Sequence, residues 1–426
     1  MTHSESNLME EIVSLESRQI QWTQELISIP TVNPYSGDSS AASEASGQDW
    51  IEEKLREMGA QVDRIPVPSD IYARGGVIGP RSRSWLHREN VVGKWKLGNG
   101  RGPRIIVNDH MDTVGVVGME IPPYDPVIED GKLHGRGSTD TKGNLVMGLI
   151  AIAGLLNKSD GLNGEIIFQS VVDEECNGAG AGTLACCVAG IDADFAIVLD
   201  GAGGDIINGC NGLATAKLLI HGRAGHCALN NTVNAIDKAC TVKSMIDSFA
   251  QGVLSRAPTC FTNIGVFHSG SIPGVVPSVA EMQINFSYPL EDAGKAKEQN
   301  DSGVIFRSEF ALAIQNLSLS DPWFKEKPVE IEWIKEVYPF LCPLESNLVN
   351  TAVQAFGEVS GRSPRVAPMA GWFDGAHLAN QLGIPTIGIG HGLPGMAHTS
   401  TEYAEMSSLL LGAKKTGLLL SRILHS

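Results

Sequence analysis

The most constraining feature of the sequence is a repeated order in which an apolar, β-branched run is followed by polar residues and then by a helical segment. Residues 103–113, 164–175 and 193–203 each contain such a run, and residues 141–158 have the composition of a helix that packs on a sheet. Buried strands that alternate with helices are typical of a largely parallel α/β sheet. Polar residues at the carboxyl ends of these strands are therefore expected to meet at one edge of the sheet.

The pattern changes after about residue 211. Alternating strand-like runs and helical segments follow in the order β-α-β-β-α-β, with the second helical segment expected over 291–316. This order predicts an inserted, ferredoxin-like α+β domain. The α/β pattern returns after Pro339, with a helix expected over 345–360. We expect three segments: catalytic domain, first part, 1–211; lid and dimerisation domain, 212–337; catalytic domain, second part, 338–426.

Composition narrows the class of protein. The 426 residues favour more than one core, and 32 Lys plus Arg against 48 Asp plus Glu disfavour nucleic acid or an anionic membrane as a partner. The longest apolar run, Leu145–Leu156, is shorter than the roughly 20 residues of a spanning helix. The polar N-terminus is unlike a secretory signal, and the eight cysteines lack C-x-x-C spacing. We therefore expect a cytoplasmic protein with free thiols.

Two histidines and several carboxylates stand in positions where a metal site is expected. A single aspartate at a strand end is usually a cap, and a single loop histidine is usually solvated. Together, imidazole and carboxylate suit Zn²⁺, or Mn²⁺ and Co²⁺, and two metals would need a bridging carboxylate. The candidates follow predicted strands or lie in loops before predicted helices: His110, Asp112, Asp140, Glu174, Glu175, Asp200 and His398.

Five segments carry a family resemblance in their order and spacing: "VNDHMDTV", "HGRGSTDTKGN", "VVDEECNGAG", "VLDG" and "GMAHTSTE". They resemble the metal-site motifs of the aminoacylase, carboxypeptidase, acetylornithine-deacetylase and succinyl-diaminopimelate-desuccinylase family of dinuclear metallohydrolases, over nearly the whole chain. The resemblance implies a zinc-exopeptidase-like catalytic domain and an amidase, deacylase or peptidase for a small N-acyl or amino-acid-like substrate.

The same resemblance implies the metal ligands. Asp140 would bridge two divalent ions, Zn²⁺ first, with Mn²⁺ or Co²⁺ as alternatives. His110 and Asp200 would complete one ion, and Glu175 and His398 would complete the other.

Roles around the metals follow from the resemblance as well. Asp112 would hold His110, and Glu402 would do the same for His398. Glu174 would be the general base for a hydroxide between the metals and would then protonate the leaving nitrogen. In a homodimer or higher homo-oligomer formed through the lid, His226 would reach into the partner's active site; its alternative is a capping or packing role.

The implied substrate site departs from the family's usual pattern. Ser287 stands where the family often has an arginine that grips a substrate carboxylate, and Trp372 is either a wall of an aromatic pocket or core filler. A second reaction therefore stays open, the hydrolytic removal of an amino group from an activated, for example nitro-substituted, aromatic acid. The implied substrate-binding residues are Asn263, Trp372, Asp374, Gly390 and His391.

Two other classes of protein are considered. A catalytically inactive metal-binding homologue would tend to lose its base, whereas Glu174 and every metal position are present. A nucleotide-dependent oxidoreductase would need G-x-G-x-x-G after the first strand, and "GRGSTDTKG" does not fit. Asp173, beside the two glutamates, is expected either to support the metal ligands without binding metal or to be structural.

Overall fold

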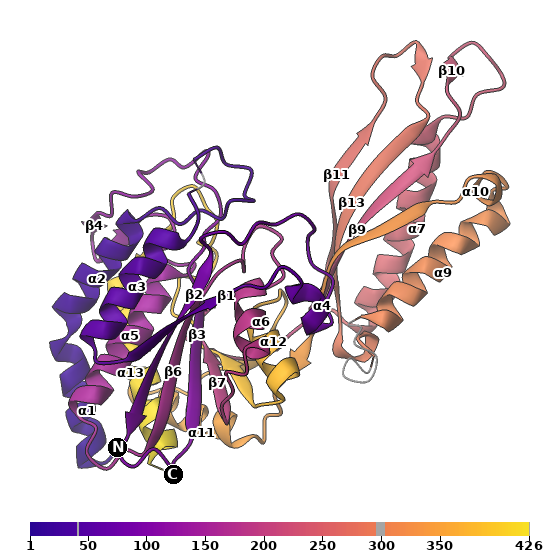
Figure 1. Cartoon of the computed structure of the whole chain (residues 1–426). Coiled ribbons are helices and arrows are strands. Elements are labelled where there is room, and N and C mark those ends of the chain that lie inside the picture. Colours follow the sequence, from indigo (N-terminus) through magenta and orange to yellow (C-terminus); the bar gives the residue numbers. More distant parts are fainter. Residues whose placement is uncertain (41, 295–302, 426) are drawn as a thin grey trace.

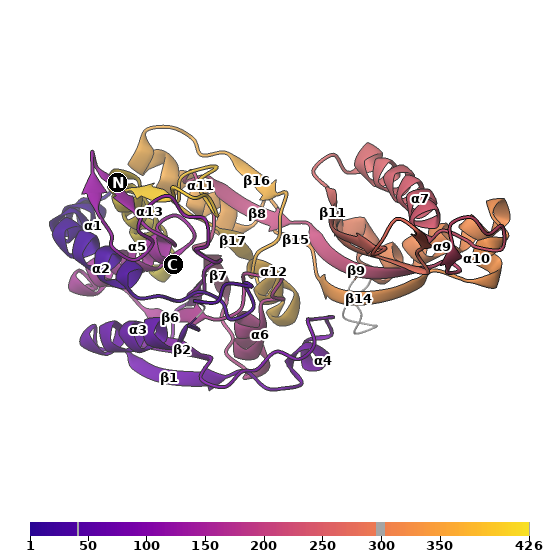
Figure 2. The same cartoon turned by 90° about the horizontal axis from the view of Figure 1, so that it is seen from above.

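The computed structural model describes residues 1–40, 42–294 and 303–425, and it contains two bodies (Figures 1 and 2). The larger body is built on a nine-stranded sheet whose path runs β1-β2-β6-β3-β7-β17-β8-β15, with β16 paired to β8. Its strands are β1 (Gln61–Pro66), β2 (Glu89–Leu97), β3 (Arg104–His110), β6 (Gly164–Val171), β7 (Phe195–Val198), β8 (Ile206–Cys210), β15 (Phe340–Leu341), β16 (Val366–Met369) and β17 (Thr386–Gly388).

The centre of this sheet is parallel and its edges are antiparallel. Strand β3 pairs in parallel with β6 and β7, and β7 pairs in parallel with β17. Strands β1, β2 and β15 pair antiparallel with their neighbours. The parallel strands end together, so the residues that follow β3, β6 and β7 share one edge of the sheet.

Helices cover both faces of the sheet. The largest apolar core joins one face to six helices, of which α5 is buried along most of its length: α1 (His3–Ser14), α2 (Glu16–Ser28), α3 (Ala45–Glu57), α5 (Lys142–Asn157), α11 (Asn347–Ser360) and α13 (Met406–Leu424). The other face packs on shorter segments: α4 (Ile71–Gly75), α6 (Ala181–Val188), α12 (Gly375–His377) and η2 (Leu378–Leu382). A small sheet completes this body: β4 (Ile128–Glu129), β5 (Lys132–His134) and β18 (Tyr403–Glu405).

The second body, called the insert below, runs from β9 to β14 (Gly212–Val337). Its four-stranded antiparallel sheet has the order β11-β13-β9-β14, and α7 and α9 pack on one face (Figure 2). This is the ferredoxin-like order of strands and helices. Its elements are β9 (Gly212–His221), β10 (Gly225–His226), α7 (Ala235–Arg256), β11 (Thr262–Ser269), β12 (Val275–Val276), β13 (Val279–Tyr288), η1 (Leu290–Asp292), α9 (Val304–Ser320), α10 (Trp323–Glu326) and β14 (Glu330–Val337).

The predicted fold class, a mostly parallel α/β sheet with an inserted α+β unit, is confirmed. Local details differ from the sequence pattern. Near the N-terminus, α1 and α2 are separated at Leu15, whose φ of −89° and ψ of 3° leave the helical region. Of the helix expected over 291–316, residues 295–302 lie outside the described residues, and α9 starts at Val304. Gly59, at φ +79°, follows the end of α3 as a left-handed terminator.

The core of the insert is aromatic and generates a stability prediction. Phe310 on α9 is fully buried, with its ring centroid 5.0 Å from that of Phe286 and 5.8 Å from that of Trp333. Phe310→Ala is expected to lower the free energy of unfolding by about 3–5 kcal/mol, because a cavity replaces the ring. Leu312 on the same helix is 57% exposed, so Leu312→Ala is the matched control and should change stability by less than about 0.5 kcal/mol. Equal urea midpoints for the two variants would contradict this packing.

Candidate metal and active site

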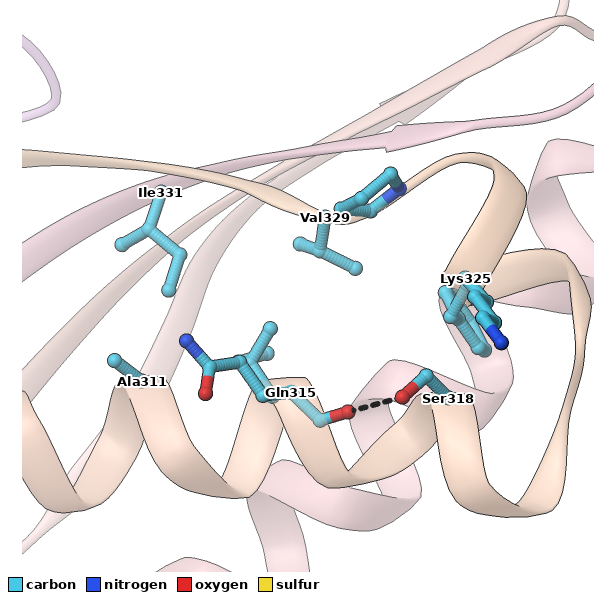
Figure 3. Close-up of a pocket in the computed structure, with 9 residues that line it drawn as sticks. Ala311, Gln315, Ser318, Lys325, Val329 and Ile331 are labelled. Carbon is cyan, nitrogen blue, oxygen red and sulfur yellow. Dashed lines mark hydrogen bonds between the residues drawn. The ribbon is translucent and has the colours of Figure 1, made fainter.

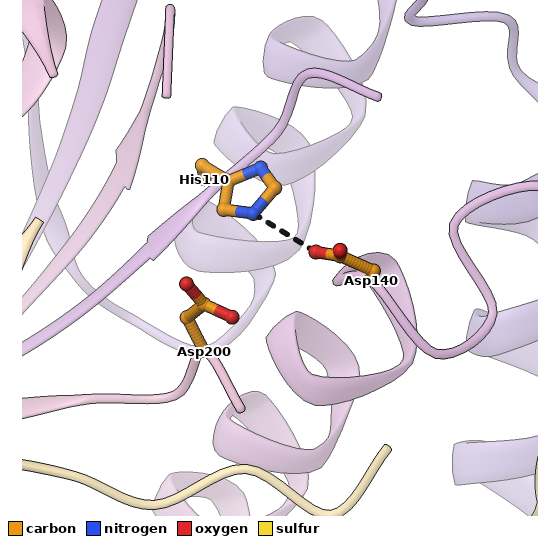
Figure 4. Close-up of side chains that lie close together, drawn as sticks. All are labelled: His110, Asp140 and Asp200. Atoms are coloured by element: carbon orange, nitrogen blue, oxygen red, sulfur yellow. Dashed lines mark ion pairs between the residues drawn. The ribbon is translucent and has the colours of Figure 1, made fainter. Parts of the chain in front are cut away.

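The candidate site lies at the carboxyl ends of the parallel strands. His110 is the last residue of β3, Glu174 and Glu175 follow β6, and Asp200 comes two residues after β7. Asp140 lies in the loop before α5, and Figure 4 shows it facing His110 and Asp200. The sheet thus brings side chains from four separate segments into one cluster.

Asp140 lies between two imidazoles. Its Oδ1 is 3.3 Å from His110 Nε2, and its Oδ2 is 3.2 Å from His398 Nε2. His398 comes from the loop before β18 and also lies 2.9 Å from Glu175 Oε1. Each carboxylate oxygen of Asp140 therefore belongs to a different group of side chains.

Two overlapping groups of possible metal ligands result. The atoms of each group lie within 4.8 Å of one another, and Asp140 belongs to both. One group is His110, Asp140 and Asp200; the other is Asp140, Glu175 and His398. These five residues are the ones expected from the sequence to bind metal, and the donor set of imidazole and carboxylate fits divalent ions such as Zn²⁺.

The electrostatics of the cluster also fit a bound cation. Burial raises the pKa of Glu174 well above its ordinary value; His110 opposes this, and Glu175 and Asp200 raise it further. Burial likewise raises the pKa of Glu175 and Asp200 to about 7, with Asp140 as the next cause in both. Buried carboxylates that disfavour one another's ionised form are stabilised by a nearby dication.

The main chain around Glu174 and Glu175 is fixed by Asp112. The Asp112 carboxylate accepts hydrogen bonds from the backbone N–H of Glu174 at 3.1 Å and of Glu175 at 3.0 Å. Its backbone carbonyl lies 2.9 Å from His110 Nδ1, whereas its carboxylate is 3.7 Å from that nitrogen. Asp112 thus contacts His110 through its backbone carbonyl, and its carboxylate positions the main chain of Glu174 and Glu175.

Glu402 supports Asp140 instead of His398. Its carboxylate accepts the backbone N–H of Thr139 at 2.9 Å and of Asp140 at 3.1 Å, and the Arg136 guanidinium at 2.6 Å. The prediction that Glu402 orients His398 is therefore wrong. The reason is that Glu402 is fully buried beside the loop before α5, where backbone donors and an arginine take both of its oxygens.

Asp173 is structural, as expected. It has a φ of +69°, is fully buried, and accepts hydrogen bonds from Arg83 and, at 3.0 Å, from Arg88. Arg88 also binds Glu44, with Nε 2.8 Å from Oε2. The first of the three consecutive acids thus turns away from the candidate metal ligands into a buried ionic cluster of Glu44, Arg83, Arg88 and Asp173.

A cavity of about 450 Å³ opens beside the cluster. Of the expected substrate-binding residues Trp372 lines it, so this side chain forms a wall of the cavity while being 7% exposed. The lining is completed by three residues of the two donor groups, by the β6–α6 loop, by the insert, and by the end of β16 with the segment after it: Asp140, Asp200 and His398; Glu174, Glu175, Cys176 and Asn177; Leu213, Asn285 and Lys335; Met369 and Gly371.

The other expected substrate-binding residues lie outside this lining. Asp374 is buried and accepts a hydrogen bond from Thr183 Oγ1 at 2.7 Å. The His391 ring is buried, with Nδ1 3.3 Å from Ser408 Oγ. Gly390 is adjacent to it, and Asn263 is exposed on β11. The substrate roles of Asp374, Gly390, His391 and Asn263 stay predictions.

Sequence reasoning missed Asn285 and Lys335, which reach the cavity from the insert. One signal was available: a lysine within the otherwise alternating run of residues 328–339 is unusual on the inner side of a strand. Ser287, where the family often has an arginine, is buried, and its Oγ accepts the Phe261 N–H at 2.7 Å.

A second hollow lies within the insert, away from the cluster. It is enclosed by α9, α10 and the start of β14, and Figure 3 shows Gln315 and Lys325 at its walls. Ser318 Oγ donates a hydrogen bond to the Gln315 carbonyl at 2.8 Å. Its lining contains no histidine, aspartate or glutamate, so we assign the chemistry to the cavity beside Asp140.

The sheet, the insert and the cluster define the class of metal-dependent hydrolases that act on C–N bonds. The chain belongs to peptidase family M20/M25/M40, whose model matches residues 106–422. The resemblance inferred from the five segments is thereby confirmed.

Curated relatives are similar along most of the chain. An N-formyl-4-amino-5-aminomethyl-2-methylpyrimidine deformylase of Halalkalibacterium halodurans is 26% identical, over 91% of this chain and 90% of its own. A succinyl-diaminopimelate desuccinylase of Buchnera aphidicola is 27% identical, over 92% of this chain and 94% of its own. Among solved structures, a dipeptidase of Saccharomyces cerevisiae has a TM-score of 0.73 at 16% identity and covers 100% of both chains. At this identity the structural likeness supports the fold alone.

The buried ionic cluster generates a second stability prediction. Arg88 is 2% exposed and contacts both Glu44 and Asp173. Arg88→Met is expected to lower the free energy of unfolding by about 3–5 kcal/mol, since buried Glu44 loses its counter-charge and Asp173 keeps only Arg83. Arg56 pairs with Glu52 and is 58% exposed. Arg56→Met is the matched control, with an expected loss below about 1 kcal/mol. Guanidinium denaturation measures both, and an Arg88→Met variant as stable as the control would refute the cluster's role.

Proposed function

We propose that the chain hydrolyses an amide-type C–N bond in a small N-acyl or amino-acid-like substrate and that it uses two divalent metal ions. The observation that carries this proposal is the Asp140 carboxylate, whose two oxygens face the imidazoles of two overlapping donor groups. Two-metal hydrolases use a carboxylate bridge with terminal ligands on each side. The names of the deformylase and desuccinylase relatives support an acyl substrate.

Each proposed ligand has a defined place. His110 and Asp200 would hold one ion, Glu175 and His398 would hold the other, and Asp140 would contact both. When bound, such ions supply Lewis-acid activation of water and of the scissile carbonyl. Zn²⁺ is the ion that we propose first, with Mn²⁺ or Co²⁺ as alternatives.

Glu174 is the proposed general base. It lines the cavity, and the Asp112 carboxylate holds its backbone N–H while its neighbour Glu175 faces His398. A raised pKa suits a carboxylate that takes a proton from the attacking water and returns it to the leaving nitrogen near neutral pH.

We also propose a homodimer in which His226 of one chain reaches the partner's site. His226 is exposed on β10, at the tip of the insert that Figure 1 draws far from the larger body. Its Nδ1 accepts the Ala228 N–H at 3.2 Å. An exposed imidazole so far from its own cluster is consistent with a role at a second chain.

The proposed domains are a catalytic domain of residues 1–211 and 338–426 and a lid and dimerisation domain of residues 212–337. The start of β9 at Gly212 and the end of β14 at Val337 support these boundaries. We propose a cytoplasmic location, which the free cysteines support. Among the described residues, no helix has the length and apolarity needed to cross a membrane.

A second candidate reaction is hydrolytic removal of an amino group from an activated aromatic acid at the same metals. The observation that favours it is Trp372, whose indole forms part of the cavity wall and offers a planar apolar surface. Comparing turnover of N-acyl amino acids with release of ammonia from nitro-substituted aminobenzoates separates the two reactions.

The general-base assignment predicts a split between metal content and turnover. Glu174→Gln is expected to keep the bound metal near the wild-type amount and to lower kcat about 10²- to 10⁴-fold, because the proton acceptor is lost. Asp140→Ala should lose metal, since both donor groups share this residue. Elemental analysis and an assay on the best N-acyl substrate measure the two properties. A Glu174→Gln enzyme that keeps a tenth of the wild-type kcat would rule out the assignment.

The dimer assignment predicts complementation between chains. His226→Ala is expected to lose activity, and mixing it with inactive Asp140→Ala chains should restore part of it, since one mixed site combines an intact metal cluster with an intact His226. The control is each variant mixed with itself. Activity that stays absent after subunit exchange would argue for a site built from one chain.

A further inference from the structure

One face of the insert's sheet carries a row of polar side chains that crosses all four strands. The register pairs Asn263 of β11 with Asn285 of β13, Asn285 with Thr215 of β9, and Thr215 with Lys335 of β14. Thr215 Oγ1 donates a hydrogen bond to Asn285 Oδ1 at 3.2 Å. The opposite face, which includes Ala216, packs on α7 and α9. The polar row therefore occupies the face that these helices leave uncovered.

A bulge in β14 brings Lys335 onto this face. Trp333 pairs with Ala216, and Lys335 pairs with the adjacent Thr215, so Ile334 is an extra residue. Strict alternation would place Lys335 on the same side as Trp333, whose ring packs in the aromatic core of the insert. One inserted residue reverses the facing of the side chains after it. The bulge thus moves the Lys335 side chain from the face of the sheet that packs on the helices to the face that lines the cavity.

Lys335 lines the same cavity as Asp140, Glu174 and His398. The residue is 5% exposed, and its ammonium lies 5.3 Å from the centre of the Trp372 ring. Among the described residues this ammonium has no hydrogen-bond or ion-pair partner. A buried ammonium without such a partner is costly to maintain, so a ligand that supplies the negative charge would stabilise it.

We propose that Lys335 binds an anionic group of the substrate, a carboxylate, and that Trp372 packs against the adjoining planar part. The inference rests on the proposed function, because it takes this cavity as the substrate site. The family resemblance places a carboxylate-binding arginine on β13, but that position is Ser287, whose Oγ accepts the Phe261 N–H. The proposal places the corresponding positive charge on β14, at Lys335.

The charge state of Lys335 suits this role. Burial lowers its pKa to about 8, while the carboxylates of Glu174, Asp173 and Asp374 favour the charged form. Lys335 is therefore mostly an ammonium at pH 7, and an arriving carboxylate would stabilise that form further.

Binding of benzoate and of its neutral isostere benzamide to the metal-loaded full chain tests the proposal. Lys335→Met keeps the length of the side chain and removes its charge, so it should weaken benzoate about tenfold or more, the loss expected for one charge-assisted hydrogen bond. Benzamide affinity should stay unchanged, and Lys335→Arg should recover most of the benzoate affinity. Titration calorimetry measures each case, with metal content checked in every variant.

A matched control is available on the neighbouring strand. Lys217 of β9 pairs with Glu281 at 2.9 Å and is absent from the cavity lining. Lys217→Met should leave both affinities at their wild-type values, which separates loss of a particular ammonium from loss of a charge on the insert.

Three outcomes would overturn the proposal: unchanged benzoate affinity in Lys335→Met, an equal loss of benzoate and benzamide, or loss of metal. In turnover, the variant should raise KM for a carboxylate-bearing substrate more than it lowers kcat. An equal fall in kcat with charged and neutral substrates would instead mean that Lys335 acts on Glu174. Calorimetry measures binding without turnover. If the chain hydrolysed no amide, the proposed function would be wrong, but the effect of Lys335→Met on benzoate affinity would still test this proposal.

Discussion

The structure depends on keeping several carboxylates together at one edge of a sheet, with Asp140 at their centre. Its two oxygens face His110 and His398, which come from opposite halves of the chain. Glu402 holds the Asp140 backbone N–H from behind, and Arg136 balances the charge of Glu402. An acid shared by two imidazoles must be placed accurately, and here buried hydrogen bonds to its main chain, together with the end of the sheet, determine its position.

Three consecutive acids after β6 are tolerated because each has a different environment. Asp173 has a left-handed backbone and points toward the arginines of the buried ionic cluster. Glu174 lines the cavity, and Glu175 faces His398. Asp112 connects the last two by accepting both of their backbone N–H groups. A local run of charge that would be unfavourable by itself is thus divided between an ionic cluster, a cavity and a candidate metal group.

Much of the site could be predicted because strand ends are visible in the sequence. The apolar runs that end at His110, Glu174 and Asp200 are local signals, and parallel pairing brings such ends together. Partners from distant segments could not be predicted in the same way. Arg83 and Arg88 lie 90 and 85 residues from Asp173, and Glu402 lies 262 residues from Asp140. Nothing in the local pattern indicates which acid such a residue will contact, so the expected pairing of Glu402 with His398 was wrong.

The sequence by itself determined the order of strands and helices, the α/β class, the position of the insert and the acids and histidines that follow the central strands. These depend on local periodicity and on the shared direction of neighbouring strands. Only the tertiary structure decided which polar side chains of the insert reach the cavity. Strict alternation along β14 would place Lys335 on the same face of the sheet as Trp333. The bulge at Ile334 places it on the opposite face, and this bulge exists only in the pairing of β14 with the distant strand β9.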